Sequence, residues 1–231
     1  VSRYVPEASE LMSTSYQSEA MLEAAFIKQL TDQAYEKLTI TSENDLIANL
    51  RLQLEILNHF KFSDAEWETF FHETIASASD GIVEKTRRIQ EDYIQILKRD
   101  DGSIKNIYLL DKEHIHNNSL QIVNQYESGE ANGSARSTRY DVTILVNGLP
   151  MVHIELKRRG VDIREAFHQI RRYQRDSFWS GSGLFEYVQV FVISNGTFTK
   201  YYSNTTRYSS ISDQTKSRRG KKTTSNSFEF T

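Results

Sequence analysis

Asp141 precedes a Glu155-Leu156-Lys157 triplet, and two carboxylates with one amine are the side chains that metal-dependent hydrolysis of a phosphodiester requires. Proteins hold Mg²⁺ through one or two carboxylates, and the ion keeps several of its own waters. A metal-bound water is a hydroxide-like nucleophile, and a neighbouring ammonium steadies that water or offsets charge at phosphorus. The three side chains therefore predict a Mg²⁺-dependent nuclease site, provided that the chain folds them together.

Residues 140–157 have the pattern of a β-hairpin that would gather these groups. In its second strand the side chains alternate, so Glu155 and Lys157 share one face. A two-residue turn at Asn147-Gly148 would pair Asp141 with the residue before Glu155 and send the aspartate to the other face of the sheet. A three-residue turn or a β-bulge would set Asp141 opposite Glu155, with Cβ atoms about 5 Å apart. We therefore expect an odd loop or a bulge in this hairpin.

The rest of the chain divides by periodicity into a helical first half and a second half of strands with one helix. Ser18 is the expected N-cap of the first helix, whose buried stripe also carries Glu19 and Glu23. Further helices are expected over residues 43–60, 65–75, 82–97 and 162–177, and strands over 104–110, 120–126, 140–146, 151–157, 187–194 and 197–202. This order predicts an α/β fold, with a mixed central β-sheet flanked by helices and an N-terminal helical part.

The helix expected from Asp162 opens with a capping-box pattern in which Glu165 reaches back, and its Gln169 and Tyr173 share one edge. The opposite arc is basic. Together with neighbouring arginines it is a candidate track for DNA phosphates: Arg139, Arg158, Arg164, His168, Arg171, Arg172 and Arg175. A solvated helix face is the plain alternative.

Composition limits the function further. The 231 residues with 38% hydrophobic content support one sizeable core, and a net charge of −3 restricts any nucleic-acid site to a local basic strip. The absence of cysteine excludes disulfides and thiolate metal sites. No apolar run approaches about 18 residues and no signal sequence is evident, so we expect a cytoplasmic protein. The chain stops as an extended segment begins at Phe228, which is typical of a fragment of a longer protein.

These residues carry a specific resemblance. Asp141, Glu155-Leu156-Lys157 and the Gln169-to-Tyr173 segment resemble the PD-(D/E)xK superfamily with a RecB-like Gln-x-x-x-Tyr extension, except that Tyr140 stands where many members have proline. The setting narrows the resemblance: an N-terminal Ser-Glu-Ala-Met-Leu-Glu helix, a Val-Asn-Gln-Tyr strand, the Arg-Tyr-Asp-Val-Thr-Ile-Leu-Val-Asn-Gly-Leu-Pro hairpin and a Ser-Asn-Gly strand end. Over residues 18–202 the chain is similar to the N-terminal endonuclease domain of the restriction (motor) subunit of type I restriction-modification enzymes.

The resemblance implies a type I site-specific deoxyribonuclease that cleaves unmodified double-stranded DNA after ATP-driven translocation. It implies methylation and specificity subunits as partners, and a C-terminal motor that this chain lacks, since no Gly-x-x-x-x-Gly-Lys-Ser/Thr occurs in it. ATP is thus expected only in the full-length subunit. We expect an N-terminal extension over residues 1–17, an endonuclease domain over 18–202 (18–100 mostly helical, 104–202 the catalytic sheet and helix) and a linker toward the motor over 203–231.

Roles follow from the chemistry as hypotheses. Asp141 and Glu155 bind Mg²⁺, the Leu156 carbonyl adds an oxygen, and Glu19 is a further or water-mediated ligand. Lys157 is catalytic, while the resemblance assigns Gln169 and Tyr173 to positioning Lys157 or the DNA. Outside this set, His114 and His116 have the spacing of a metal pair but no evident third ligand.

Two other functions stay open. The first is a catalytically silent nuclease fold that docks the motor on DNA or on partner subunits. The second is a RecB-like exonuclease or a junction resolvase. An ATPase motor encoded after Thr231 would distinguish a type I subunit from a resolvase.

Overall fold

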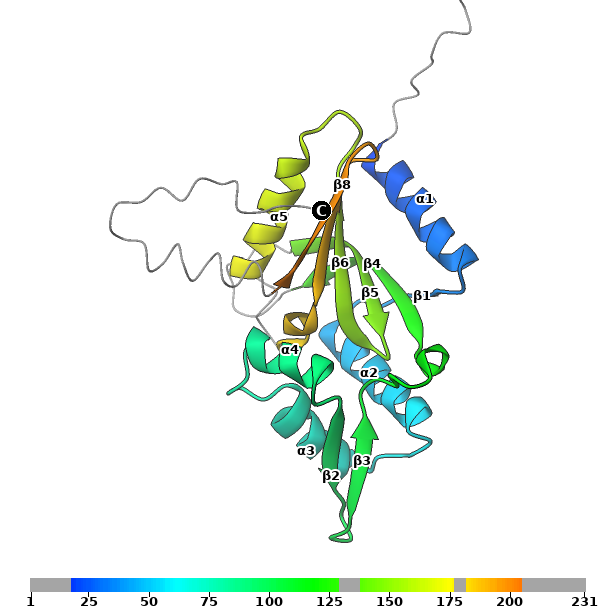
Figure 1. Ribbon diagram of the computed structural model, residues 1–231, viewed down its shortest axis with the longest axis vertical. Coiled ribbons are helices and arrows are strands. Elements are labelled where there is room, and N and C mark those ends of the chain that lie inside the picture. Colours follow the sequence, from blue (N-terminus) through cyan, green and yellow to red (C-terminus); the bar gives the residue numbers. More distant parts are fainter. Residues whose placement is uncertain (1–17, 129–137, 177–181, 205–231) are drawn as a thin grey trace, which may run out of the picture.

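A six-stranded mixed sheet forms the centre of the computed structural model, which describes residues 18–128, 138–176 and 182–204 (Figure 1). Its strands, in spatial order, are β1 (Glu36–Leu38), β4 (Leu120–Ser128), β5 (Thr138–Val146), β6 (Leu149–Leu156), β7 (Val190–Ser194) and β8 (Thr199–Ser203). The pairs β1–β4 and β6–β7 are parallel, and the other neighbours are antiparallel. The helices are α1 (Glu19–Asp32), α2 (Glu43–Leu57), α3 (Asp64–Phe70), α4 (Ile82–Gln90) and α5 (Ile163–Asp176). The predicted α/β fold with a mixed sheet and flanking helices is confirmed.

Different helices cover the two faces of the central strands of the sheet (Figure 1). Helix α1 packs Ile27 and Leu30 against Ile154 and Leu156 of β6. Helix α5 covers the other face, where its buried Ile170 belongs to the larger core that also contains residues of α2 and α3. The central strand β6 is therefore enclosed from above and below, as its run of buried residues indicates.

Serine caps begin the first three helices. The Ser18 Oγ accepts the Met21 N–H at 3.2 Å, as expected for the first helix. Ser42 and Ser63 each take part in a capping box, with Asp45 and Glu66 as the returning carboxylates. Helix α3 continues into a π-helical turn, Phe71–Ile75, so the helix expected over 65–75 is present in two geometries. None of the helices in the described ranges is long and apolar enough to cross a membrane.

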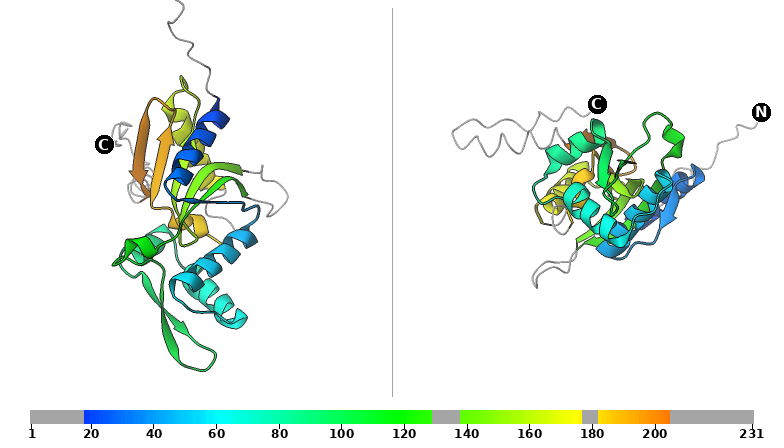
Figure 2. Two further views of the ribbon diagram at one scale, coloured as in Figure 1. Left: turned by 90° about the vertical axis from the view of Figure 1, so that its right-hand side faces the viewer. Right: turned by 90° about the horizontal axis from the view of Figure 1, so that it is seen from below.

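The prediction of one helix over 82–97 is wrong. Helix α4 ends at Gln90, and the next residues form β2 (Ile94–Lys98), which pairs antiparallel with β3 (Ile104–Tyr108). Leu97 and Ile107 face the core while Ile96 and Ile104 are exposed, which is a period of two rather than 3.6. Gly102 has a φ of 81° in the connecting turn. This hairpin projects from the end of the molecule away from the sheet (Figure 2, left).

The other helices and strands differ less from their expected boundaries. The short strand β1 was not expected, and the strand placed over 187–194 begins at Val190 because residues 184–187 form a 3₁₀ turn. The helix of the basic arc begins as expected, and the Asp162 carboxylate accepts the Arg164 N–H at 2.9 Å. The expected extension over 1–17 lies outside the described residues, as does the linker beyond residue 204.

The β5–β6 hairpin contains the predicted bulge. Asn147 and Gly148 form a two-residue turn with φ values of 50° and 83°. The pairing then shifts, since Leu145 lies opposite Pro150 but Ile144 lies opposite Val152, which leaves one extra residue on β6. Beyond the shift Val142 pairs with Ile154, so the same register brings Asp141 level with Glu155. The bulge therefore places Asp141 opposite Glu155, as the predicted metal site requires.

Candidate functional site

Glu155 and Lys157 lie at the end of β6, between β5 and β7, and are both buried. The Lys157 Nζ donates to the Glu155 Oε1 at 2.9 Å and to the Leu156 carbonyl at 3.2 Å. The Lys157 backbone N–H donates to the Ser194 carbonyl of β7 at 2.8 Å, which fixes the chain just past the strand. The lysine and the glutamate are thus held as one ion pair on a central strand.

Asp141 joins them from β5. Its Oδ2 accepts the Leu156 N–H at 2.8 Å, so the carboxylate is attached to the backbone between Glu155 and Lys157. Asp141 is half-buried, and the charge of the nearby Glu155 contributes to the raised pKa of its carboxyl group. The structure therefore brings together the three side chains that the sequence singled out.

The two carboxylates are electrostatically costly without a cation. Burial, and then the charge of Glu155, raise the pKa of Asp141 to about 7. Burial also raises the pKa of Glu155 to about 7, although the ammonium of Lys157 opposes that shift. Two acids that are this easily protonated near neutral pH mark a place where additional positive charge would be stabilising.

The donor set fits a hard divalent ion. Glu155 Oε2 is buried and accepts no hydrogen bond from the described residues, so it keeps a free coordination site. Asp141, the Leu156 carbonyl and water would complete an oxygen set of the kind that Mg²⁺ prefers. Within the described ranges no three His, Asp or Glu side chains gather as a full metal set, so the ion would rest on two carboxylates, a backbone oxygen and waters. Glu19 is exposed, and its Oε1 accepts the Arg158 N–H at 3.4 Å.

Gln169 and Tyr173 connect α5 to the strand that carries Asp141. The Gln169 Nε2 donates to the Tyr173 hydroxyl, which donates in turn to the Arg139 carbonyl at 2.8 Å. The Tyr173 ring lies 5.0 Å, centroid to centroid, from that of Tyr140, the residue before Asp141. Burial raises the pKa of Tyr173, so its hydroxyl stays protonated as a donor.

The basic arc is on the surface. Six of its seven members are exposed: Arg139, Arg158, Arg164, His168, Arg171 and Arg172. The side chain of Arg175 lies outside the described residues. Exposure is compatible with contact to phosphates and equally with a solvated helix face.

The structure also defines the surroundings of four other side chains. His153 is fully buried with its Nε2 3.7 Å from the Glu155 Oε2, and burial lowers its pKa to about 3, so it is a neutral sheet histidine. In the sequence, only the alternation of His153 with Glu155 along the strand indicated that the two side chains are neighbours. Glu23 is also buried, facing β4 from α1. His114 and His116 form an exposed ring pair with 6.1 Å between centroids.

The raised carboxyl pKa values predict that the metal-free chain loses stability as the pH rises from about 4 to about 7. In this window the folded chain binds more protons than the unfolded chain, whose carboxyls have ordinary values of 3.8 and 4.5. Thermal unfolding in a chelator should give a melting temperature that falls across the window relative to the Asp141→Asn, Glu155→Gln double variant. Saturating Mg²⁺ should raise the parent's melting temperature at pH 8. A parent and a double variant with parallel pH profiles would contradict the buried-acid description.

Comparisons with known proteins place the chain among named relatives. A family described as "Type I restriction enzyme R protein N terminus" matches residues 16–210. The Escherichia coli type I restriction enzyme EcoprrI endonuclease subunit is 50% identical over 197 residues, which cover 85% of this chain and 62% of that protein. The SsaAORF53P endonuclease subunit of Staphylococcus saprophyticus is 42% identical over 194 residues, covering 82% of this chain and 20% of that protein. The chain thus spans less than two thirds of the length of either relative.

Proposed function

Because the chain belongs to the family of type I restriction enzyme R protein N termini, we propose that it is the DNA-cleaving domain of such an enzyme. The observation that carries the proposal is the half-buried Asp141 next to the buried Glu155 and the ammonium of Lys157. The endonuclease names of the relatives support the same reaction, hydrolysis of a phosphodiester bond.

Asp141, Glu155 and the Leu156 carbonyl would hold Mg²⁺, with Glu19 acting through a water. When bound there, Mg²⁺ would supply a water of lowered pKa and positive charge for the oxygens of the phosphate. The chain's own contribution is a preformed oxygen set, since the Leu156 N–H orients Asp141 and the Lys157 ammonium orients Glu155.

Lys157 places a positive charge beside the reacting phosphate. Its ammonium is held by Glu155 and the Leu156 carbonyl, so it would already be oriented when DNA arrives. Tyr173 acts indirectly, because its hydrogen bond to the Arg139 carbonyl fixes the strand that carries Asp141. Gln169 in turn orients the Tyr173 hydroxyl. The exposed arginines of the basic arc would contact phosphates without reading sequence.

The whole enzyme extends beyond this chain. We assign double-stranded DNA as the substrate, and methylation and specificity subunits together with the subunit's own ATP-driven motor as the partners that choose and deliver it. Residues 18–202 would be the nuclease domain and residues 203–231 the connection to the motor, within a cytoplasmic complex. The subunit names of the relatives support a multisubunit assembly.

The test compares plasmid cleavage with ATP hydrolysis in the reassembled full-length enzyme. Lys157→Ala removes the ammonium and leaves both carboxylates, so cleavage of unmodified plasmid should fall about 100-fold. The rate of ATP hydrolysis should equal that of the parent. Chelating Mg²⁺ stops both reactions and therefore cannot separate them, which is why the variant is needed.

Parental cleavage by Lys157→Ala would overturn the assignment and favour the docking-module alternative. Loss of ATP hydrolysis together with cleavage would instead indicate that the substitution disturbs assembly. Lys157→Arg provides the control for charge without the same geometry, and an intermediate rate is expected from it.

A further inference from the structure

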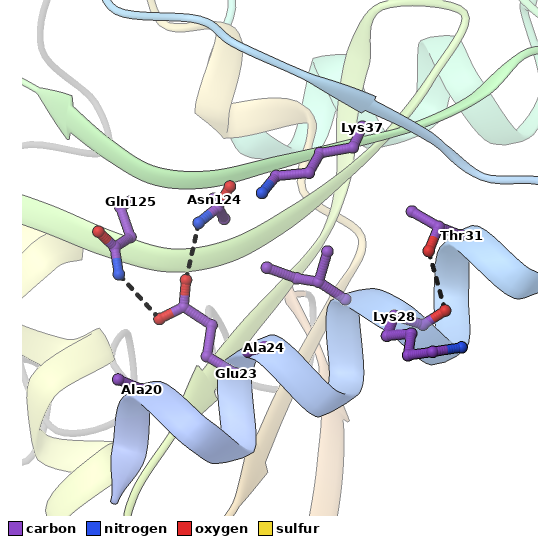
Figure 3. A pocket seen from close by; sticks show the side chains of 9 residues that line it. Ala20, Glu23, Ala24, Lys28, Thr31, Lys37, Asn124 and Gln125 are labelled. Carbon is purple, nitrogen blue, oxygen red and sulfur yellow. Dashed lines mark hydrogen bonds between the residues drawn. The ribbon is translucent and has the colours of Figure 1, made fainter.

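A groove of about 360 Å³ runs between α1 and the strands β1 and β4 (Figure 3). Helix α1 lies on the side of the sheet opposite α5 (Figure 1). Small side chains of α1, Ala20 and Ala24, form one wall. The polar side chains of the groove come from three elements: Glu23, Lys28 and Thr31 from α1, Lys37 from β1, and Asn124 with Gln125 from β4. No role in the proposed chemistry has been given to any of them.

The amide groups of the groove are held in a fixed orientation by the buried Glu23. The Glu23 Oε1 accepts from the Asn124 Nδ2 at 2.9 Å, and its Oε2 accepts from the Gln125 Nε2 at 3.1 Å. Since the N–H side of each amide is bound to Glu23, the amide carbonyl oxygens are left as acceptors (Figure 3). A ligand here would therefore present hydrogen-bond donors, such as the amino groups on the edge of a nucleobase.

One lysine supplies the positive charge. Lys28 is paired with Asp32 at 2.5 Å and points away from Asn124, whereas Lys37 extends toward Asn124 (Figure 3). Lys37 is exposed and makes no ion pair within the described ranges. An ammonium beside an apolar wall and oriented acceptors is complementary to a nucleotide, which combines a phosphate, a flat ring and exocyclic amino groups. The volume is also that of one small ligand rather than of a duplex.

The groove borders the strand that carries Asp141. The β4–β5 ladder passes from the Asn124–Val142 pair to the Tyr126–Tyr140 pair, so Gln125 lies level with Asp141. Gln125 has a φ of 55° inside a strand, a strained conformation of the kind that collects at functional sites. At the other end Ala20 follows Glu19, which accepts the Arg158 N–H.

We propose that this groove binds one nucleotide of the DNA strand that is being cut, next to the scissile phosphate. The inference rests on the proposed nuclease function and adds to it a second contact on the α1 side of the sheet. In this arrangement the Lys37 ammonium binds the phosphate. The side-chain carbonyls of Asn124 and Gln125 accept hydrogen bonds from the base edge, and the ring of the base packs against Ala20 and Ala24. A peptide segment of a partner subunit is the competing occupant.

Filling the groove tests the proposal, and α1 offers a matched control. Ala24 and Ala25 are both exposed, but only Ala24 lines the groove. The chain is titrated with a labelled 12-nucleotide single strand of mixed sequence, with Ca²⁺ in place of Mg²⁺. Ala24→Phe should weaken binding about tenfold and Ala25→Phe less than twofold. Lys37→Gln should lower the salt dependence of binding by about one phosphate contact.

Equal binding by Ala24→Phe and Ala25→Phe would overturn the proposal, as would a parent chain that does not bind the strand at low salt. So would an Ala24→Phe enzyme that binds DNA normally but fails to assemble, because the groove would then take a protein segment. Glu155→Gln separates the two levels of inference. If Glu155→Gln still cuts while Ala24→Phe loses the strand, the nuclease assignment fails and the nucleotide groove stands.

Discussion

Replacing Glu155 by glutamine is expected to lower DNA cleavage by the assembled full-length enzyme about 1,000-fold or more, with ATP hydrolysis unchanged. The substitution keeps the shape of the side chain but removes the charge that Lys157 and Asp141 surround. A metal site of two carboxylates loses half of its formal negative charge, and several kcal/mol of transition-state stabilisation corresponds to about three powers of ten in rate. This is the largest effect on activity expected from any single side chain of the site.

Metal binding provides the second readout for Glu155→Gln. Calorimetric titration of the 231-residue chain with Mn²⁺ should show binding to the parent and little to the variant. Glu165→Gln is the matched control, because Glu165 is an exposed acid in the first turn of α5. If Glu155→Gln cleaved DNA at the parental rate, this site would take no part in the reaction. Retained Mn²⁺ binding with lost cleavage would leave Glu155 a catalytic role but move the metal elsewhere.

Gly148→Ala is expected to produce the largest loss of stability. Gly148 has a φ of 83° in the β5–β6 turn, and a Cβ there would lie 2.6 Å from the Leu50 Cα and 3.1 Å from its N. Both contacts are with the backbone of α2, so no flexible side chain can give way. The left-handed conformation costs about 1 kcal/mol and the forced separation of turn and helix about 1–3 kcal/mol more. The melting temperature should fall by about 5–15 °C.

Gly102→Ala separates the two causes. Gly102 has nearly the same φ, 81°, but a Cβ at Gly102 would meet nothing within 4 Å. It should therefore lose only the conformational part, about 2–4 °C in melting temperature. Both variants are compared with the parent by thermal unfolding under the same buffer conditions. Equal losses in the two variants would mean that the turn does not press on α2 as the structure describes.

The hairpin of the site was predicted well from the sequence, because its features depend on residues that are close together in the chain. Alternation on β6 and the level placement of Asp141 with Glu155 follow from the pleat and one bulge, and both are confirmed. The roles of Asp141, Glu155 and Lys157 in catalysis stay predictions until the variants are measured. The Ser18 cap was also predicted correctly, since capping depends on only three or four neighbouring residues.

What escaped prediction depends on contacts between distant residues. The stretch 94–98 carries apolar residues that fit a helix, and only pairing with β3 makes it a strand. Glu23 on its stripe looked ambiguous, because its partners Asn124 and Gln125 are about a hundred positions away in the sequence. The burial of His153 likewise results from the aromatic side chains of α5 and neighbouring strands, such as Tyr173 and Phe191, which the alternation of β6 does not reveal.

The two acids of the site lie on neighbouring strands that are bonded to each other, but the strand of Asp141 has an additional bond to α5. Asp141 follows a strand segment that Tyr173 ties to α5 through the Arg139 carbonyl. Glu155 and Lys157 belong to β6, whose end is bonded to β7. A small displacement of α5 along the sheet would therefore act on the strand segment that precedes Asp141. A partner or DNA segment bound to the exposed arginines of α5 would in this way change the position of Asp141 in the site.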